Sequence, residues 1–235
     1  VRRFESAQGY HPPMRTGEVR HLFWYLHFMR INDSKAVLLA TNNRAKQGKL
    51  SWLLRGAGIP VVTPQEIRLV QPSFDEDNGT HESNAVGKAT IWSKIYDGVA
   101  IASDGGFNIP MLGNLWNSLH TRRFSEGSDV SRANELTTLT ASLEGEDRRA
   151  YWVEALAVAG HGTLHRTFTA CSGVGYVAHR VREDLIANGF WVGSVWYFPE
   201  FGKYYPELSL QELERFGDHW INLHRQIVEA LRDGS

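Results

Sequence analysis

The stretch that most constrains the fold is residues 36–54, which has the pattern of a strand, a loop and a helix in direct succession. Residues 36–40 form an apolar run with the length and composition of a buried strand. Leu50, Leu53 and Leu54 then restart the apolar pattern at helical spacing. A buried strand that leads straight into a helix is typical of an α/β fold, so we expect that class.

The polar loop between this strand and helix, residues 41–46, has two interpretations. The free backbone N–H groups and the helix dipole at such a junction favour an anion, and Lys46 adds a full positive charge. The same residues also fit an ordinary turn in which Asn42 and Asn43 only tolerate unusual dihedrals. These residues alone leave both interpretations open.

The composition limits the partners. The chain has 25 basic and 26 acidic residues and a formal net charge of -1, so no overall field recruits nucleic acid or an anionic membrane. No apolar run approaches the ~20 residues that span a bilayer. The single cysteine, Cys171, fits a reducing compartment, and we interpret it as a small core residue. We therefore expect a cytoplasmic protein that binds neither a nucleic acid polymer nor a membrane.

Two parts of the chain differ in character. Residues 1–34 combine Pro12 and Pro13 with the aromatic-rich run 21–29. Their apolar density is too high for a free tail, so we expect an N-terminal extension that packs on the body or covers an interface. Residues 35–235 have no internal repeat and no linker rich in Gly, Ser or Pro, and we expect them to form a single domain.

Other elements follow from periodicity and turn signals. We expect helices over 83–94, 131–143 and 221–231 and a short strand over 99–102, followed at once by Asp104. Acids just past such a strand end lie where open α/β sheets bind ligands. The remaining expectations are a strand from residue 59, a hairpin of 151–159 and 163–171, an extended loop over 109–126, and an aromatic strand-like run over 189–199.

The polar landmarks suit phosphate and magnesium chemistry. Mg²⁺ prefers one or two carboxylates together with phosphate oxygens and water, and Glu76 and Asp104 supply them if the fold brings the two together. Lysines such as Lys46 and Lys88 neutralise phosphate charge, and a carboxylate beside the metal can take a proton from water. The alternative is that Glu76 is a solvated loop acid and Lys88 a charge on a helix surface.

Several motifs also resemble, in register, those of one known family. Residues 39–54, LATNNRAKQGKLSWLL, resemble the opening motif of the inosine triphosphate pyrophosphatase family, which cleaves aberrant purine nucleoside triphosphates to monophosphate and pyrophosphate. Residues 76–89 resemble its acidic loop and Asn-Ala-x-x-Lys-Ala helix, and residues 100–107 resemble its Asp-Asp-Ser-Gly strand end. With Gly189-Phe190, Pro199, Gly202-Lys203 and residues 207–209, the resemblance covers about residues 35–232.

The resemblance implies an elongated mixed β-sheet flanked by helices, in two lobes around a central cleft, and a homodimer. It implies that Mg²⁺ is held by Glu76 and Asp104, and that Asp104 binds the metal or activates the water that attacks between the α- and β-phosphates. The substrate-binding residues implied by it are Thr41, Asn43 and Lys46 on the triphosphate, Lys88 assisting them, Phe190 stacked on the base, and Lys203.

Departures from the family pattern concentrate around the base. The family has a second acid where this chain has Ser103, an Asp within the stretch that is 189–194 here, and Ser-His-Arg where this chain has Gly217-Asp218-His219. We therefore expect a Mg²⁺-dependent nucleoside triphosphate pyrophosphohydrolase with altered base specificity. The alternatives are a nucleotide-binding module that has lost catalysis, and an interaction protein that uses the aromatic N-terminal segment and a Trp-rich face.

Overall fold

A computed structural model describes residues 36–55, 59–73, 79–186 and 190–233. The expected N-terminal extension, residues 1–34, and the expected metal ligand Glu76 lie outside these ranges. Within them, no helix has the length and apolar character needed to cross a membrane.

An eight-stranded mixed sheet forms the centre of the molecule, in the order β2-β1-β3-β4-β6-β7-β8, with β5 also paired to β4. Strand β1 pairs in parallel with β2 and β3, and the other pairs are antiparallel. The strands are β1 (Val37–Leu39), β2 (Val61–Val62), β3 (Val99–Asn108), β4 (Arg149–Gly160), β5 (Thr163–Cys171), β6 (Gly175–Val177), β7 (Trp196–Phe198) and β8 (Lys203–Tyr204).

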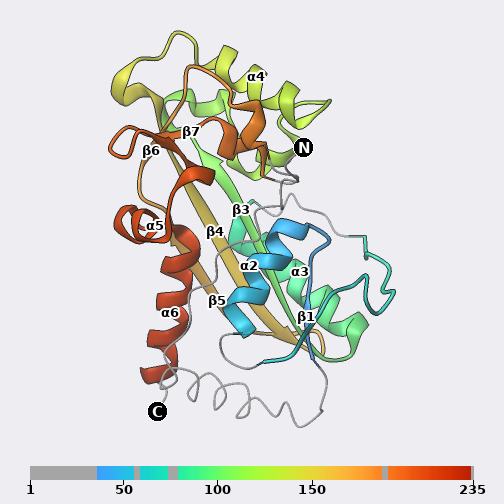
Figure 1. Cartoon of the computed structure of the whole chain (residues 1–235). Coiled ribbons are helices and arrows are strands. Elements are labelled where there is room, and N and C mark those ends of the chain that lie inside the picture. The colour runs from blue at the N-terminus through green and yellow to red at the C-terminus, as the bar shows by residue number, and fades with distance from the viewer. Residues whose placement is uncertain (1–35, 56–58, 74–78, 187–189, 234–235) are drawn as a thin grey trace, which may run out of the picture.

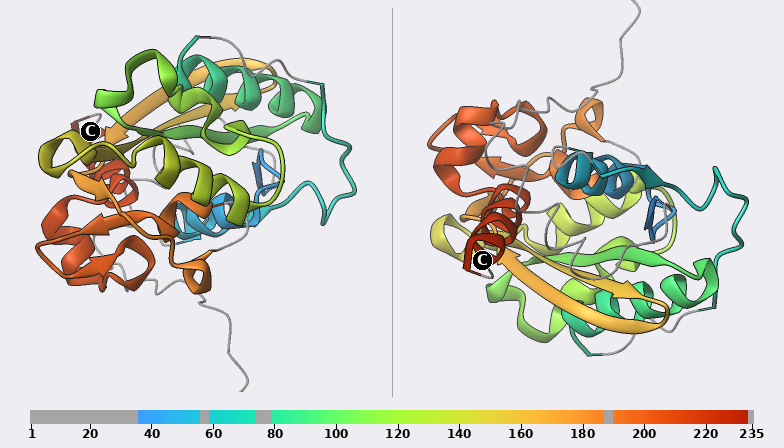
Figure 2. Two further views of the ribbon diagram at one scale, coloured as in Figure 1. Left: turned by 90° about the horizontal axis from the view of Figure 1, so that it is seen from above. Right: turned by 90° about the horizontal axis from the view of Figure 1, so that it is seen from below.

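Helices cover both faces of the sheet, as Figure 2 shows. Helices α2 and α6 lie on one face and α3 on the other. Two further helices, α4 and α5, lie toward the end of the long strands β3 and β4 at which Asn108 pairs with Tyr151 (Figure 1). The helices are α2 (Arg44–Arg55), α3 (His81–Tyr96), α4 (Asp129–Leu139), α5 (Leu210–Phe216) and α6 (His219–Asp233). The expected α/β class, with a mixed sheet flanked by helices, is confirmed.

The sequence pattern explains why these helices begin and face as they do. Thr80 caps α3 in a capping box with Ser83, which satisfies backbone groups at the helix start. Ala85, Ala89 and Trp92 share the buried face of α3, as their spacing predicts. Burying this apolar stripe against β1, β3 and β4 fixes α3 across the sheet.

Besides the cores that α2 with α6 and α3 form on the two faces of the sheet, a third hydrophobic cluster surrounds the end of β3 and β4 at which Asn108 pairs with Tyr151. Phe107 of β3 and Trp152 of β4 pack there with Trp191 and Trp196 from the C-terminal part of the chain. Strands β3 and β4 pair continuously from Val99↔Gly160 to Asn108↔Tyr151, so they run through both parts of the molecule (Figure 1).

Several expected boundaries were wrong. Helix α2 begins at Arg44, inside the segment expected to be a loop, because Asn43 caps it. The expected loop 109–126 contains two 3₁₀ helices, Pro110–Leu115 and Ser118–Arg123. Cys171 is exposed at the end of β5 rather than in the core.

Candidate active site

Asp104 lies within β3 rather than past its end. Strand β1 pairs with β3 only as far as Leu39↔Ile101, and beyond that point β3 continues to Asn108 with β4 as its ladder partner. Asp104 therefore stands just past the end of β1, near the start of α2. Its side chain is mostly buried, with 13% exposed.

One side of α3 supplies three partners to the Asp104 carboxylate. His81 Nδ1 lies 2.8 Å from Oδ2, Asn84 Nδ2 donates to Oδ2 at 3.4 Å, and Lys88 Nζ donates to Oδ1 at 2.6 Å. These residues occupy positions i, i+3 and i+7, so they share one stripe of the helix. A carboxylate can only accept, so Nδ1 of His81 carries the proton of its bond.

This surrounding holds Asp104 in its ionised form. Burial by itself raises the pKa of the carboxyl, but the hydrogen bond from His81 and the charges of Lys46 and Lys88 outweigh it. The pKa of Asp104 therefore lies well below its usual range. A negative charge at this point is a permanent feature of the site at neutral pH.

His81 also connects Asp104 to the loop that follows β3. Its Nε2 lies 3.1 Å from Oγ of Ser118, the first residue of the second 3₁₀ helix. The His81 ring is about 10% exposed and is held at both nitrogens. The geometry fixes the ring orientation, and through it the position of the carboxylate.

The loop before α2 is largely occupied with holding its own shape. Asn43 Oδ1 accepts hydrogen bonds from the backbone N–H groups of Ala45 (2.9 Å) and Lys46 (3.2 Å), as an N-cap residue does. Thr41 Oγ1 in turn accepts from the N–H of Asn43 at 3.1 Å. The ordinary-turn interpretation thus accounts for these contacts of Thr41 and Asn43, while the ammonium of Lys46 lies against the middle of the paired strands β3 and β4.

Lys46 meets a second carboxylate there. Its Nζ lies 3.1 Å from Oε1 of Glu154 and 3.5 Å from the carbonyl oxygen of Ser103. Glu154 is paired with Gly105 across the β3–β4 ladder and is 1% exposed. Since successive side chains of a strand alternate, Glu154 lies on the face of α2 and α6, opposite to Asp104.

The region of the expected base site is densely aromatic. Phe190 contacts Trp152 (ring centroids 5.2 Å apart) and Tyr205 (5.3 Å), and Trp152 stacks on His219 (5.7 Å, 30°). The Trp152 indole N–H donates to Glu154 Oε2 at 2.7 Å. Burial is the main reason that the pKa of His219 lies below its usual value.

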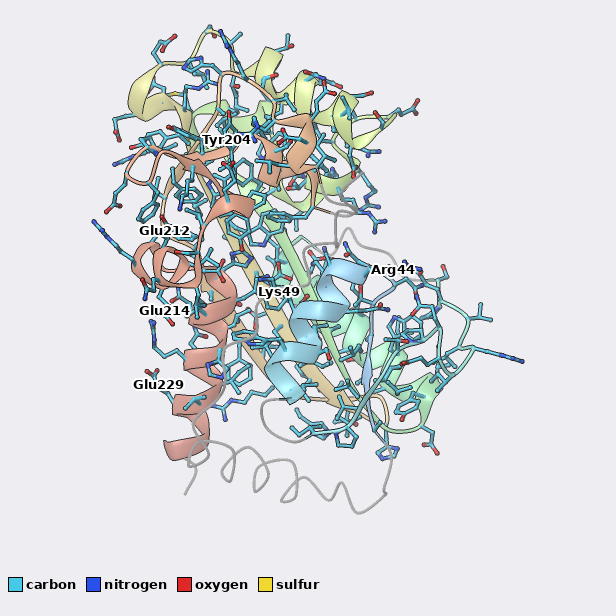
Figure 3. All side chains as sticks on the ribbon, in the orientation of Figure 1. Arg44, Lys49, Tyr204, Glu212, Glu214 and Glu229 are labelled. Carbon is cyan, nitrogen blue, oxygen red and sulfur yellow. The ribbon has the colours of Figure 1, made fainter. Side chains whose placement is uncertain are left out.

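Lysine side chains of α2 also act on the first residue of α6. Figure 3 labels Lys49 on the side of α2 that faces α6, and the charge of Lys49 acts on His219, the first residue of α6. Lys203, in contrast, donates to both carboxylate oxygens of Glu212 on α5, at 2.8 and 2.9 Å. This pair is the contact that the structure gives for Lys203, and it holds β8 to α5.

The structure thus brings three of the expected residues together: Asp104, Lys88 and Lys46. Sequence reasoning missed His81 and Glu154. His81 could have been found because it continues the helical stripe of Asn84 and Lys88. Glu154 could have been found because it is the one acid in the largely apolar strand β4, and buried acids are rare unless they are paired.

The donor set fits a hard cation only in combination with a substrate. Among the described residues, no group of three or more His, Cys, Asp or Glu side chains could hold a metal ion. Asp104 offers one ionised carboxylate. Mg²⁺ often binds through one or two carboxylates, substrate phosphates and water, so Asp104 suits that role.

Comparison with known proteins identifies the family. The model of the Ham1 family matches residues 37–219, which is most of the chain. The chain belongs to the Ham1 family. Among Ham1-family relatives, the dITP/XTP pyrophosphatase of one Thermus thermophilus strain is 29% identical over 84% of this chain and 92% of its own length. That of Pectobacterium atrosepticum is 28% identical over 84% of this chain and 98% of its own.

Solved structures agree with this fold. A HAM1 protein from Coxiella burnetii matches with a TM-score of 0.67 and 24% identity, over 84% of this chain and 98% of that one. The Ham1 protein of Staphylococcus aureus matches with a TM-score of 0.66 and 21% identity, over 86% and 100% of the two chains.

Proposed function

We propose that this protein hydrolyses a nucleoside triphosphate to the monophosphate and pyrophosphate, with Mg²⁺ as cofactor and a base preference of its own. The observation that carries the proposal is Asp104, an ionised and largely buried carboxylate held between the charges of Lys88 and Lys46. The names of the Ham1-family relatives support the same reaction class.

The two lysines have the electrostatic part in this proposal. A triphosphate carries several negative charges, and Lys46 and Lys88 offer full positive charges beside the middle of β3. Such preorganised charges stabilise the charge that develops on the phosphates during bond cleavage. The cap of Asn43 and Thr41 serves by fixing the first turn of α2, from which Lys46 projects.

Asp104 is better suited to hold a cation than to take a proton. An effective general base has a pKa near the working pH, whereas the pKa of Asp104 lies well below its usual range. We therefore assign Asp104 the role of metal ligand, together with Glu76, which lies outside the described residues. A Mg²⁺ ion bound there supplies charge neutralisation and a fixed orientation of the phosphates.

The base preference follows from the aromatic end of the site. Phe190 is the proposed stacking residue, and it packs against Trp152, which in turn stacks on His219. The family's Asp and Arg are missing from the stretches 189–194 and 217–219, respectively. Hydrogen-bonding groups determine discrimination between bases far more than apolar surface does. Lys203 is a further proposed substrate-binding residue. It must first leave Glu212, to which its ammonium donates.

The test is a panel of natural and deaminated nucleoside triphosphates, including dITP and XTP, incubated with the full chain and Mg²⁺. We expect pyrophosphate and the monophosphate from at least one of them, and none in EDTA. Absence of pyrophosphate from the whole panel overturns the proposal. Release of inorganic phosphate instead of pyrophosphate would overturn the position of the cleaved bond.

Binding without turnover is the second candidate. It is favoured by Ser103, which stands in place of the family's second acid and whose side chain is buried, with 2% of the residue exposed. Calorimetry with the best-bound nucleotide separates the two functions. Tight binding without any hydrolysis would favour the binding module.

The proposal also includes a homodimer in the cytoplasm, with the nucleotide as its small-molecule partner and no role for a nucleic acid polymer or a membrane. The dimer is supported by the family resemblance, and the near-zero net charge of -1 fits a site that attracts anions only locally. Light scattering on the full chain tests the oligomeric state. A monomer at all concentrations would overturn this part.

A further inference from the structure

Glu154 is a buried charge that the proposed reaction does not use. It stands in the middle of the strand β4, between the apolar neighbours Val153 and Ala155, in a strand whose residues are mostly buried. A buried carboxylate is costly unless it is paired and hydrogen-bonded, and replacing such a pair with apolar groups often stabilises a protein. Stability alone is therefore a weak reason for an acid at this position.

The backbone of β3 leaves room for this carboxylate. Gly105 lies opposite Glu154 in the ladder, and a Cβ atom on Gly105 would lie 2.0 Å from Oε2 of Glu154 and 2.6 Å from the carbonyl oxygen of Val153. Any side chain at position 105 would collide with it. The carboxylate therefore lies directly over Gly105, which follows Asp104 within β3, but on the opposite face of the sheet from the Asp104 side chain.

Each oxygen of Glu154 has a different partner. Oε1 lies 3.1 Å from the ammonium of Lys46, which belongs to the phosphate end of the proposed site. Oε2 accepts the indole N–H of Trp152 at 2.7 Å. Trp152 in turn packs against Phe190, the proposed base-stacking residue, and against His219.

The exposed fractions of the Lys46 and Glu154 side chains indicate which of the two an incoming ligand contacts first. The side chain of Lys46 is 20% exposed and that of Glu154 only 1%, so the carboxylate lies behind the ammonium. An incoming triphosphate contacts Lys46, and Glu154 acts on it through Lys46. The negative charge behind the ammonium also opposes the binding of an anion.

We propose that Glu154 is a positioning and specificity-determining residue, which ties the phosphate-binding ammonium of Lys46 to Trp152, the ring that packs against the proposed base-stacking residue Phe190. This inference rests on the proposed function. A base that packs well against Phe190 keeps Trp152 and Glu154 in place, and Glu154 then holds Lys46 where it contacts the phosphates. A base that displaces Trp152 disturbs Lys46 as well.

The first test is Glu154→Gln, whose amide oxygen can still accept from Trp152 while the charge beside Lys46 is lost. Without the opposing charge, inorganic tripolyphosphate should bind more tightly, as measured by calorimetry in EDTA. Because Lys46 is no longer held, kcat should fall by about tenfold or more while KM does not rise. The ratio of kcat/KM between the best and the worst base should narrow.

The second test is Trp152→Phe, which keeps a ring but removes the N–H donor to Glu154. The pair of Lys46 and Glu154 survives in this variant, so tripolyphosphate should bind as it does to the wild type. The ratio of kcat/KM between the best and the worst base should decrease, as it does for Glu154→Gln. This variant keeps the inference testable where Glu154→Gln fails to fold.

Matched controls remove a comparable acid or indole N–H that has no hydrogen bond or ion pair with Lys46, Glu154 or Trp152. Glu146→Gln removes an acid that is paired with Arg149 and Tyr176 on the surface. Trp116→Phe removes a buried indole N–H that donates to the Phe107 carbonyl. Both should leave tripolyphosphate binding and the discrimination ratio unchanged.

A purely structural Glu154 gives a different result. In that case Glu154→Gln lowers the melting temperature but leaves tripolyphosphate affinity, kcat and the discrimination ratio of the folded protein unchanged, and the inference is overturned. A wild-type protein that hydrolyses none of the nucleotides overturns the proposed function instead, and the tripolyphosphate measurement still reports on the pairing of Glu154 with Lys46.

Discussion

The two faces of the sheet hold two carboxylates, Asp104 and Glu154, in contrasting ways. The hydrogen bonds shown for Asp104 come from a single helix, since His81, Asn84 and Lys88 share one stripe of α3, and the charge of Lys46 on α2 adds to them. Glu154 has one partner from α2 and one from its own strand. The first arrangement holds a charge in place redundantly, whereas the second connects distant parts of the molecule and depends on each contact.

The largest effect should come from Asp104→Asn. A neutral amide binds a cation poorly and cannot balance Lys46 and Lys88, so we expect turnover to fall by about 10³-fold. Steady-state pyrophosphate release measures this. Asp129→Asn, at the start of α4, is the control and should retain activity. Comparable activity in both variants would remove Asp104 from the site.

Comparing Lys46→Gln with Lys88→Gln tests whether Glu154 depends more on its single cationic partner than Asp104 does on one of its several partners. Loss of Lys46 leaves Glu154 buried without an opposite charge, which should cost about 2 kcal/mol of unfolding free energy, less than for a fully buried pair because Lys46 is partly exposed. Loss of Lys88 leaves Asp104 with His81 and Asn84, so about 1 kcal/mol is expected. Urea unfolding gives both values, and equal losses would contradict the contrast.

His81→Phe probes the positioning of Asp104. The ring would keep its volume but lose both hydrogen bonds, and we expect kcat to fall about tenfold with little change in KM. Ser118→Ala removes only the outer bond of His81, so its effect should be smaller. A larger loss in Ser118→Ala than in His81→Phe would mean that the serine acts independently of His81.

The smallest effect is the pH dependence contributed by His219. Burial lowers its pKa below the ordinary 6.5, with Lys49 and Lys46 acting in the same direction and Asp218 and Glu154 opposing them. The unfolded chain therefore binds the proton first, and stability should be greatest above pH 6.5 and decline as the pH falls below it. The slope is at most about 1.4 kcal/mol per pH unit. His219→Gln should flatten this part of the curve of unfolding free energy against pH.

Much of the fold could be predicted because its signals are local. The first strand and helix, the buried face of α3 and the hairpin of β4 and β5 follow from apolar periodicity and turn residues between neighbours. The family assignment and the α/β class were also confirmed. The roles given to Glu76, Phe190 and Lys203 stay predictions.

The extent of β3 and the C-terminal aromatic packing could not be predicted in the same way. Residues 103–108 contain Ser, Asp and two glycines, which favour turns, but pairing with β4 keeps them extended. Residues 191–198 form a short 3₁₀ helix and a short strand instead of one long strand, because Trp191 and Trp196 pack into the third hydrophobic cluster.

The sequence by itself determined the elements, the family and the presence of acids and lysines suited to a phosphate site. Only the tertiary structure decided which charges meet. Successive side chains of a strand alternate between the two faces of the sheet, and Glu154 pairs with Gly105, the neighbour of Asp104. Asp104 therefore contacts α3, whereas Glu154 contacts Lys46 and Trp152 on the opposite face. The physical reason is that the contacts of Lys88 with Asp104 and of Lys46 with Glu154 join residues 16 and 108 positions apart along the chain, whose register and packing no local pattern encodes.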